Sequence, residues 1–122
     1  MTLHFSIVYA DDDANARTVL KDALAERGID VRTCESGPDA IALCRERTPD
    51  AALLSIDPPR DDAFETARAL RSDPATAQIR LVALTGRGTW DLRTKALEVG
   101  FDEFVVKPVP VESLLRALRA AA

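Results

Sequence analysis

The sequence predicts an α/β fold, in which a parallel β-sheet has helices packed on both faces. Short apolar runs alternate five times with longer segments whose apolar residues recur at every third or fourth position. Several runs are apolar without a break, which is typical of strands that are buried on both faces. Because parallel strands are joined by right-handed crossover helices, a (βα)5 alternation favours a doubly wound, three-layer sandwich. We expect a single domain over residues 1–122, a length that suffices for one core.

Five apolar runs supply the expected strands. In chain order they are FSIVYA (5–10), DVRTC (30–34), AALLSI (51–56), RLVAL (80–84) and EFVVK (103–107). The third run is the most apolar, and only Ser55 interrupts it. Runs of this kind suit the centre of a parallel sheet, whereas half-exposed strands alternate between apolar and polar residues.

Five amphipathic segments supply the expected helices. They cover residues 14–27, 37–47, 63–72, 89–99 and 109–120. In the first segment Ala16, Leu20 and Leu24 recur at helical spacing, and Gly28 is placed to end the helix. The last segment carries its apolar residues on one face, namely Val111, Leu114, Leu115 and Leu118.

Composition and charge are those of a soluble globular protein. Hydrophobic residues make up 47% and charged residues 30% of the chain, and the net charge is -4. This acidic balance argues against direct binding to nucleic acid, which needs a clustered positive face. No run approaches the roughly 18 apolar residues of a membrane span, and no secretion signal precedes the first strand. We therefore expect a cytoplasmic protein in which Cys34 and Cys44 are small buried thiols.

Polar side chains follow four of the five expected strands at their carboxyl ends. Because ligands bind beyond these ends in open parallel sheets, we expect the side chains to form one site. Neighbouring carboxylates repel each other unless a cation such as Mg²⁺ or a lysine lies nearby. Carboxylates, a lysine and a hydroxyl together indicate a site that handles phosphoryl groups. The residues are Asp11, Asp12 and Asp13 after the first strand, Ser55 and Asp57 at the third, Thr85 at the fourth and Lys107 at the fifth.

The chain resembles a receiver domain of the two-component response-regulator family over essentially its full length. The matching segments are IVYADDDANAR, TPDAALLSIDPP, LVALTG and GFDEFVVKPV. The resemblance implies a flavodoxin-like fold with strand order 2-1-3-4-5. It also implies a signalling role without enzymatic activity, in partnership with a histidine kinase, a phosphotransfer protein or an output domain. The segment KALEVGFDEFVVKPV is similar to receivers attached to hybrid sensor kinases.

Carried over to this sequence, the resemblance gives each residue at the strand ends a role. Asp11 and Asp12 match the acidic pair that holds Mg²⁺. Asp57 matches the position whose backbone carbonyl completes the metal site. The remaining matches are the phosphate-contacting Lys107, the switch hydroxyl of Thr85 and the switch aromatic Phe104.

The position that accepts phosphate in this family is an aspartate, and here it is Ser55. The family places the acceptor five residues after the Asp of a Pro-Asp pair and four before a proline, which are Asp50 and Pro59 in this chain. A serine hydroxyl is a weak nucleophile without a base, and the only histidine, His4, lies at the opposite end of the first strand. The sequence therefore predicts that phosphorelay chemistry at this position is lost.

The missing carboxylate also bears on the metal site. Asp11 and Asp12 are left facing Lys107, so we expect Mg²⁺ binding to be weakened. Asp57 would restore part of the negative charge if its side chain turned inward. The following loop, PPRDDAF, has Arg60 and Ala63 where the family usually has glycines, so we expect it to be stiffer.

Plainer interpretations stand beside these roles. Asp12 or Asp13 also suits the N-cap of the helix that follows. Thr85 and Lys107 also read as ordinary polar residues at strand ends, and Ser55 as an inert space-filler. Trp90 either covers the last helices or presents a surface that binds a partner.

Three hypotheses follow for the function. The leading one is a protein-interaction module in two-component signalling that works without phosphorylation at position 55. It would dock through the face formed by the fourth helix, the fifth strand and the fifth helix. The second is a working receiver that is phosphorylated at Asp57 or at Ser55 itself. The third is an engineered replacement of the acceptor by Ser55.

Two alternatives come from other classes of protein. A haloacid-dehalogenase-like phosphatase also combines an Asp-x-Asp pair, here Asp11 and Asp13, with a threonine and a lysine at strand ends. Against it, Asn15 stands where that family has Thr or Val, and 122 residues are short for that fold. A flavodoxin-like redox protein shares the topology, but the first loop lacks a cradle for phosphate rich in Gly, Ser or Thr.

Overall fold

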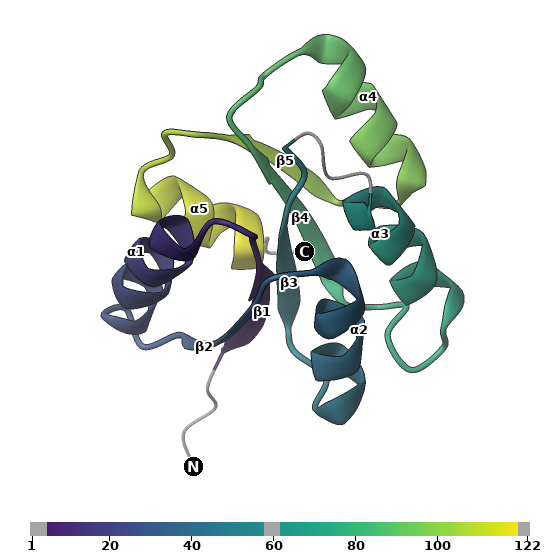
Figure 1. Cartoon of the computed structure of the whole chain (residues 1–122), viewed down its shortest axis with the longest axis horizontal. Helices are drawn as coiled ribbons and strands as arrows, with labels where there is room; N and C mark the ends of the chain where they lie inside the picture. The colour runs from purple at the N-terminus through teal and green to yellow at the C-terminus, as the bar shows by residue number, and fades with distance from the viewer. Residues whose placement is uncertain (1–4, 58–61, 120–122) are drawn as a thin grey trace.

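The computed structural model describes residues 5–57 and 62–119, in which strands and helices alternate (Figure 1). The strands are β1 (Ser6–Ala10), β2 (Asp30–Cys34), β3 (Ala51–Ser55), β4 (Arg80–Thr85) and β5 (Glu103–Val106). The helices are α1 (Ala14–Ala25), α2 (Gly37–Glu46), α3 (Asp62–Ser72), α4 (Trp90–Val99) and α5 (Val111–Arg119). The strands are parallel and are hydrogen-bonded in the order β2-β1-β3-β4-β5. The predicted fold class and strand order are therefore confirmed.

Helices α1 and α5 cover one face of the sheet, and α2, α3 and α4 cover the other (Figure 1). Neighbouring residues of a strand point to opposite faces, so each central strand contributes to two cores. On β1, Ile7 packs in the core with Leu24 of α1 and Leu114 of α5. Its neighbour Val8 packs in the other core, which holds Phe64 of α3. Burial on both faces explains why the strands read as unbroken apolar runs.

The helix boundaries follow local signals in the sequence. The N-cap of α1 is Asp13, whose side chain accepts hydrogen bonds from the N–H groups of Asn15 and Ala16 at 2.9 and 3.2 Å. The interpretation of Asp13 as a cap is thus confirmed. Gly28 follows the helix with a φ of +80°, the left-handed conformation that favours glycine there. The apolar face predicted for α5 is confirmed by its buried residues Leu114, Leu115 and Leu118.

Two strands end one residue before the expected bounds, and both ends belong to the candidate site. β3 ends at Ser55 rather than Ile56, and β5 ends at Val106, so Lys107 lies just beyond it. The backbone N–H of Lys107 donates to the carbonyl of Thr85 at 2.7 Å. This bond keeps the lysine beside the end of β4.

Other predictions meet the structure in part. Cys44 is buried, and burial raises the pKa of its thiol to about 11, whereas Cys34 is only half-buried. Across residues 5–57 and 62–119 no helix is both long and apolar enough to cross a membrane. Ala63 lies in the first turn of α3 and is buried. The predictions outside the described residues are those on His4, Pro59, Arg60 and the two ends of the expected domain.

Candidate functional site

The register of the sheet brings four strand ends to one edge. Ala10 pairs with Leu54 between β1 and β3, and Ser55 pairs with Leu84 between β3 and β4. The residues that follow these pairs are therefore neighbours in space. The predicted site residues at this edge are Asp11, Asp12, Asp13, Ser55, Asp57, Thr85 and Lys107.

Asp11 is buried and is bound both by its neighbours in the chain and by Lys107. Only 2% of its surface is exposed. Its Oδ2 accepts the Tyr9 hydroxyl at 2.7 Å, and its Oδ1 accepts the Asp13 N–H at 3.0 Å. The guanidinium of Arg17 donates to its backbone carbonyl at 2.7 Å, and the Lys107 Nζ lies 3.8 Å from Oδ2. Asp12, the next residue, is exposed.

Tyr9 is a site residue that the sequence analysis missed. Its side chain is fully buried, and burial together with the hydrogen bond to Asp11 holds the pKa of the phenol far above its ordinary value. The phenol therefore remains a proton donor to the carboxylate. The available signal was the spacing, since residues i and i+2 of a strand point to the same side of the sheet. A tyrosine two residues before a strand-end aspartate is placed to reach it.

Asp57 turns its side chain toward Thr85 and Lys107. Its Oδ1 accepts the Thr85 hydroxyl at 2.5 Å and the Gly86 N–H at 2.9 Å. Its Oδ2 lies 3.8 Å from the Lys107 Nζ. The resemblance gave Asp57 a role through its backbone carbonyl alone, so the contacts of the carboxylate and of Gly86 are additional findings.

Ser55 is the last residue of β3, and 5% of its surface is exposed. It lines a cavity of about 10 Å³ together with Gly37, Ala63 and Thr66. The carboxylate beside Lys107 on this strand end belongs to Asp57, two residues further along the chain. Lys107 thus has two carboxylates at 3.8 Å, those of Asp11 and Asp57.

The arrangement of the strand-end side chains is unfavourable for a hard divalent cation, because a lysine lies beside two of the carboxylates. Within residues 5–57 and 62–119 no three His, Cys, Asp or Glu side chains converge closely enough to hold a metal ion. The Lys107 Nζ lies 3.8 Å from a carboxylate oxygen of Asp11 and 3.8 Å from one of Asp57. Both Asp11 oxygens also accept hydrogen bonds. The ammonium group neutralises charge that Mg²⁺ would need.

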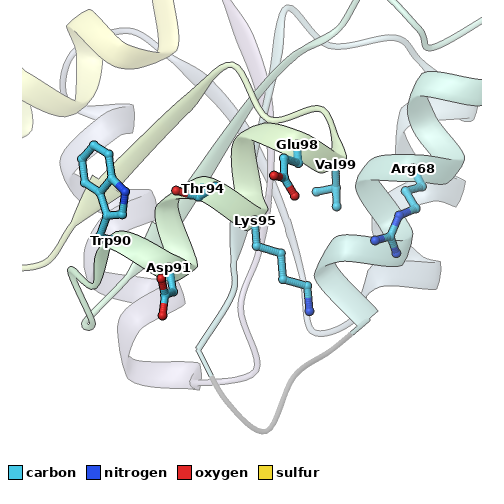
Figure 2. Close-up of a pocket in the computed structure, with 7 residues that line it drawn as sticks. All are labelled: Arg68, Trp90, Asp91, Thr94, Lys95, Glu98 and Val99. Carbon is cyan, nitrogen blue, oxygen red and sulfur yellow. The ribbon is translucent and has the colours of Figure 1, made fainter.

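The two aromatic residues lie at different depths. Phe104 of β5 is half-buried and packs against the core beneath α2, α3 and α4. Trp90 is the first residue of α4 and is 76% exposed, so the interpretation that it covers the last helices is wrong. Figure 2 shows Trp90 at one end of α4, where it borders a groove whose far wall is Arg68 of α3.

An open sheet in this order, with acids, a threonine and a lysine at its carboxyl edge, has the architecture of a receiver-type signalling domain. The family model for the response regulator receiver domain matches residues 7–119. The chain therefore belongs to this family, whose members act in two-component signalling.

Individual relatives agree with this assignment. The phosphate regulon transcriptional regulatory protein PhoB of Pseudomonas aeruginosa is 33% identical over 115 residues, which cover 94% of this chain and 50% of PhoB. The BeF3-activated N-terminal receiver domain of RstA from Klebsiella pneumoniae is 29% identical, with a TM-score of 0.84 over 94% of this chain and 96% of that one. The chain spans about half the length of the curated relatives it matches.

A third relative shows the same fold with a metal. The receiver domain of the sensor histidine kinase PA1611 from Pseudomonas aeruginosa has a TM-score of 0.86 and 23% identity, and the match covers 97% of each chain. That structure holds a magnesium ion in its active-site cleft.

Proposed function

We propose that this receiver domain signals through protein interaction without phosphorylation at the usual acceptor position. The observation that carries the proposal is the end of β3, where Ser55 occupies the strand end and the Asp57 carboxylate engages Thr85, Gly86 and Lys107. In the family these strand-end groups serve phosphoryl transfer to an aspartate. Here the nucleophile that the position requires is replaced by a neutral hydroxyl.

Hydrogen bonds to the nearby carboxylates argue against Ser55 as an acceptor. A serine hydroxyl needs a base, and both carboxylate oxygens of Asp11 already accept hydrogen bonds, from Tyr9 and from Asp13. The other carboxylate, Asp57, is bound to Thr85 and Gly86. Asp11 and Asp57 are therefore already engaged in hydrogen bonds that compete with a role as base.

Asp57 is the second candidate acceptor, because it is an anionic oxygen nucleophile beside Lys107. Against Asp57, Thr85 and Lys107 are the groups that would bind the oxygens of the transferred phosphoryl group. Both already contact the Asp57 carboxylate itself. Mg²⁺, which would assist the transfer, is expected to bind weakly, because Lys107 shields the two carboxylates.

The docking surface that we propose is the face of α4, β5 and α5. It carries the exposed large side chains Trp90, Leu97 and Val106, with 76%, 41% and 39% of their surfaces accessible. Members of the family interact with histidine kinases, phosphotransfer proteins or output domains, and these are the partners we propose. We also propose that the domain works in the cytoplasm and has no direct contact with nucleic acid, since its net charge is -4.

The test is incubation with acetyl phosphate and Mg²⁺, followed by measurement of the intact mass. We expect no stoichiometric adduct, whereas a receiver with an acceptor aspartate gains one phosphate under the same conditions. An adduct of one phosphate per chain would overturn the proposal. Its chemistry would identify the acceptor, because an acyl phosphate is lost in acid and a serine ester survives. The variant Asp57→Asn separates the two further, since it abolishes only an adduct on Asp57.

Family membership also bears on the alternatives from other classes. The phosphatase and the redox protein were favoured only by topology and strand-end residues. Receiver domains have the same topology and strand-end residues. The family model covers residues 7–119, which include the first loop and the strand ends that suggested the alternatives. We propose that the domain has no enzymatic activity of its own.

A further inference from the structure

One carboxylate joins the end of β3 to the loop between β4 and α4. The Asp57 Oδ1 accepts the Thr85 hydroxyl at 2.5 Å and the Gly86 N–H at 2.9 Å. The oxygen of the Thr85 hydroxyl in turn accepts the Arg87 N–H at 2.9 Å. On the other side, the Asp57 Oδ2 faces the Lys107 Nζ at 3.8 Å. A hydroxyl, a backbone N–H and an ammonium group are the donors that a bound anion uses in proteins.

We propose that the Asp57 carboxylate is a built-in anion, which occupies the donors that would hold a phosphoryl group and thereby fixes the loop between β4 and α4. This inference rests on the proposed function, in which the pocket does not turn over phosphate. It adds that the Asp57 carboxylate takes the place of the phosphoryl group, and that this carboxylate holds the hydroxyl of the switch threonine, Thr85.

The charges around Lys107 indicate that carboxylates already fill the position of a bound anion. Lys107 lies 3.8 Å from Asp11 on one side and 3.8 Å from Asp57 on the other. A phosphate that entered beside Lys107 and Thr85 would lie next to the Asp57 carboxylate. Two neighbouring anions repel each other. An external anion can therefore bind only after the Asp57 side chain has left.

The loop depends on few other contacts. Residues 86–90 are all exposed, so little apolar burial orders them. Thr85 is fully buried, and its hydrogen bond to Asp57 is the start of a chain that passes to Gly86 and Arg87. The next anchor is Thr89, the N-cap of α4, whose side chain accepts the N–H of Leu92. The contacts of Asp57 therefore hold the first residues of the loop, and Thr89 holds its end at α4.

This path leads to the proposed docking surface. Trp90 directly follows the N-cap and is the single tryptophan of the chain. A change in the loop would alter the surroundings of its indole ring. Trp90 fluorescence therefore reports the loop without any added label.

The test compares wild type with Asp57→Ala by amide hydrogen exchange and by Trp90 fluorescence. We expect the Gly86 amide of Asp57→Ala to exchange roughly tenfold faster or more, as for the loss of a hydrogen bond to a charged group. Asp57→Asn keeps an oxygen acceptor but loses the charge, and an intermediate rate is expected. The matched control is Asp91→Asn, which removes one carboxylate from the first turn of α4 and leaves the Asp57 contacts in place.

A second experiment repeats the exchange and fluorescence measurements with inorganic phosphate added. Added to Asp57→Ala, phosphate should slow exchange at Gly86 and restore the Trp90 emission in a saturable way, whereas wild type should not respond. Unchanged Gly86 exchange in both Asp57 variants, or an equal phosphate response in wild type, would overturn the inference. A phosphate adduct on wild type in the acetyl phosphate experiment would overturn the proposed function, whatever the exchange rate of Gly86 in the Asp57 variants. The two failures are thus distinguishable, and Asp57→Asn serves for the exchange measurement if Asp57→Ala does not fold.

Discussion

The two carboxylates that flank Lys107 belong to regions with different kinds of contact. Asp11, in the first loop, is 2% exposed, and its carboxylate accepts hydrogen bonds from Tyr9 and Asp13, each two residues away in the chain. Asp57, beyond β3, has 35% of its side chain exposed and contacts Thr85 and Gly86, which lie 28 and 29 residues away. Both lie 3.8 Å from the same ammonium group.

The difference indicates that the two carboxylates have separate effects. Asp11 stabilises the turn in which it lies, and Asp57 holds a loop that is distant in the chain. Local bonds to a buried carboxylate stabilise the turn in which it sits, and they transmit little to other elements. Long-range bonds to a half-exposed carboxylate cost less stability when broken, but they release a distant loop. We therefore expect substitutions around Asp11 to change the free energy of unfolding. Substitutions around Asp57 should change chemistry and local order instead.

The largest effect is expected from rebuilding the end of β3. In the double variant Ser55→Asp with Asp57→Asn, the acceptor carboxylate returns and its competitor for Lys107 and Thr85 loses its charge. We expect acetyl phosphate and Mg²⁺ to give an acid-labile adduct approaching one phosphate per chain, measured by intact mass. Mg²⁺ binding, measured by Trp90 fluorescence, should strengthen in parallel because one more carboxylate faces the metal position.

The single variant Ser55→Asp is the control for this experiment. It should gain less phosphate than the double variant, because Asp57 still engages Thr85 and Lys107. Equal phosphate on the two variants would show that Asp57 does not compete for these groups. No phosphate on either would show that the pocket differs from a working receiver in more than the end of β3.

The sequence predicted the fold and the composition of this pocket, but not its internal contacts. Unbroken apolar runs and capping residues are local signals, and they gave five strands and five helices within a few residues of their observed bounds. Strand ends of a parallel sheet meet at one edge, so Asp11, Thr85 and Lys107 could be placed together. The direction of the Asp57 side chain depends on Thr85 and Lys107, which are distant in the chain. No local pattern contains that information.

Tyr9→Phe should have the second largest effect, on stability. The substitution keeps the buried ring and removes the hydroxyl that donates to Asp11 at 2.7 Å. A buried carboxylate that loses one donor costs about 2 kcal/mol, and urea unfolding at pH 7 measures it. In an Asp11→Asn background the same substitution should cost less, since the acceptor is no longer charged. A loss below about 0.5 kcal/mol in wild type would contradict a structural role for the contact.

The dependence of the free energy of unfolding on pH tests the hydrogen bond between Tyr9 and Asp11 independently. The pKa of Tyr9 is raised in the folded state by burial and by the hydrogen bond to Asp11, so the unfolded chain ionises first, near the ordinary value of 10. The unfolded state then binds fewer protons, and stability falls as the pH rises above about 10. The advantage of wild type over Tyr9→Phe should be full below that pH and shrink above it. Tyr9 is the only tyrosine, so phenolate absorbance follows it directly.

The smallest effect is expected at Asp13, whose side chain caps α1 while its backbone N–H serves Asp11. Asp13→Ala should lower the free energy of unfolding by about 1 kcal/mol, because the N–H groups of Asn15 and Ala16 lose their acceptor. Asp13→Ser should recover most of this loss, since serine also caps helices. The backbone bond to Asp11 survives both changes, and the Asp13 charge is only a lesser cause of the raised pKa of Tyr9, so the alkaline titration of Tyr9 should move only slightly downward. A large shift would mean that the cap and the buried carboxylate of Asp11 are one unit, and the first loop would then transmit changes as the end of β3 does.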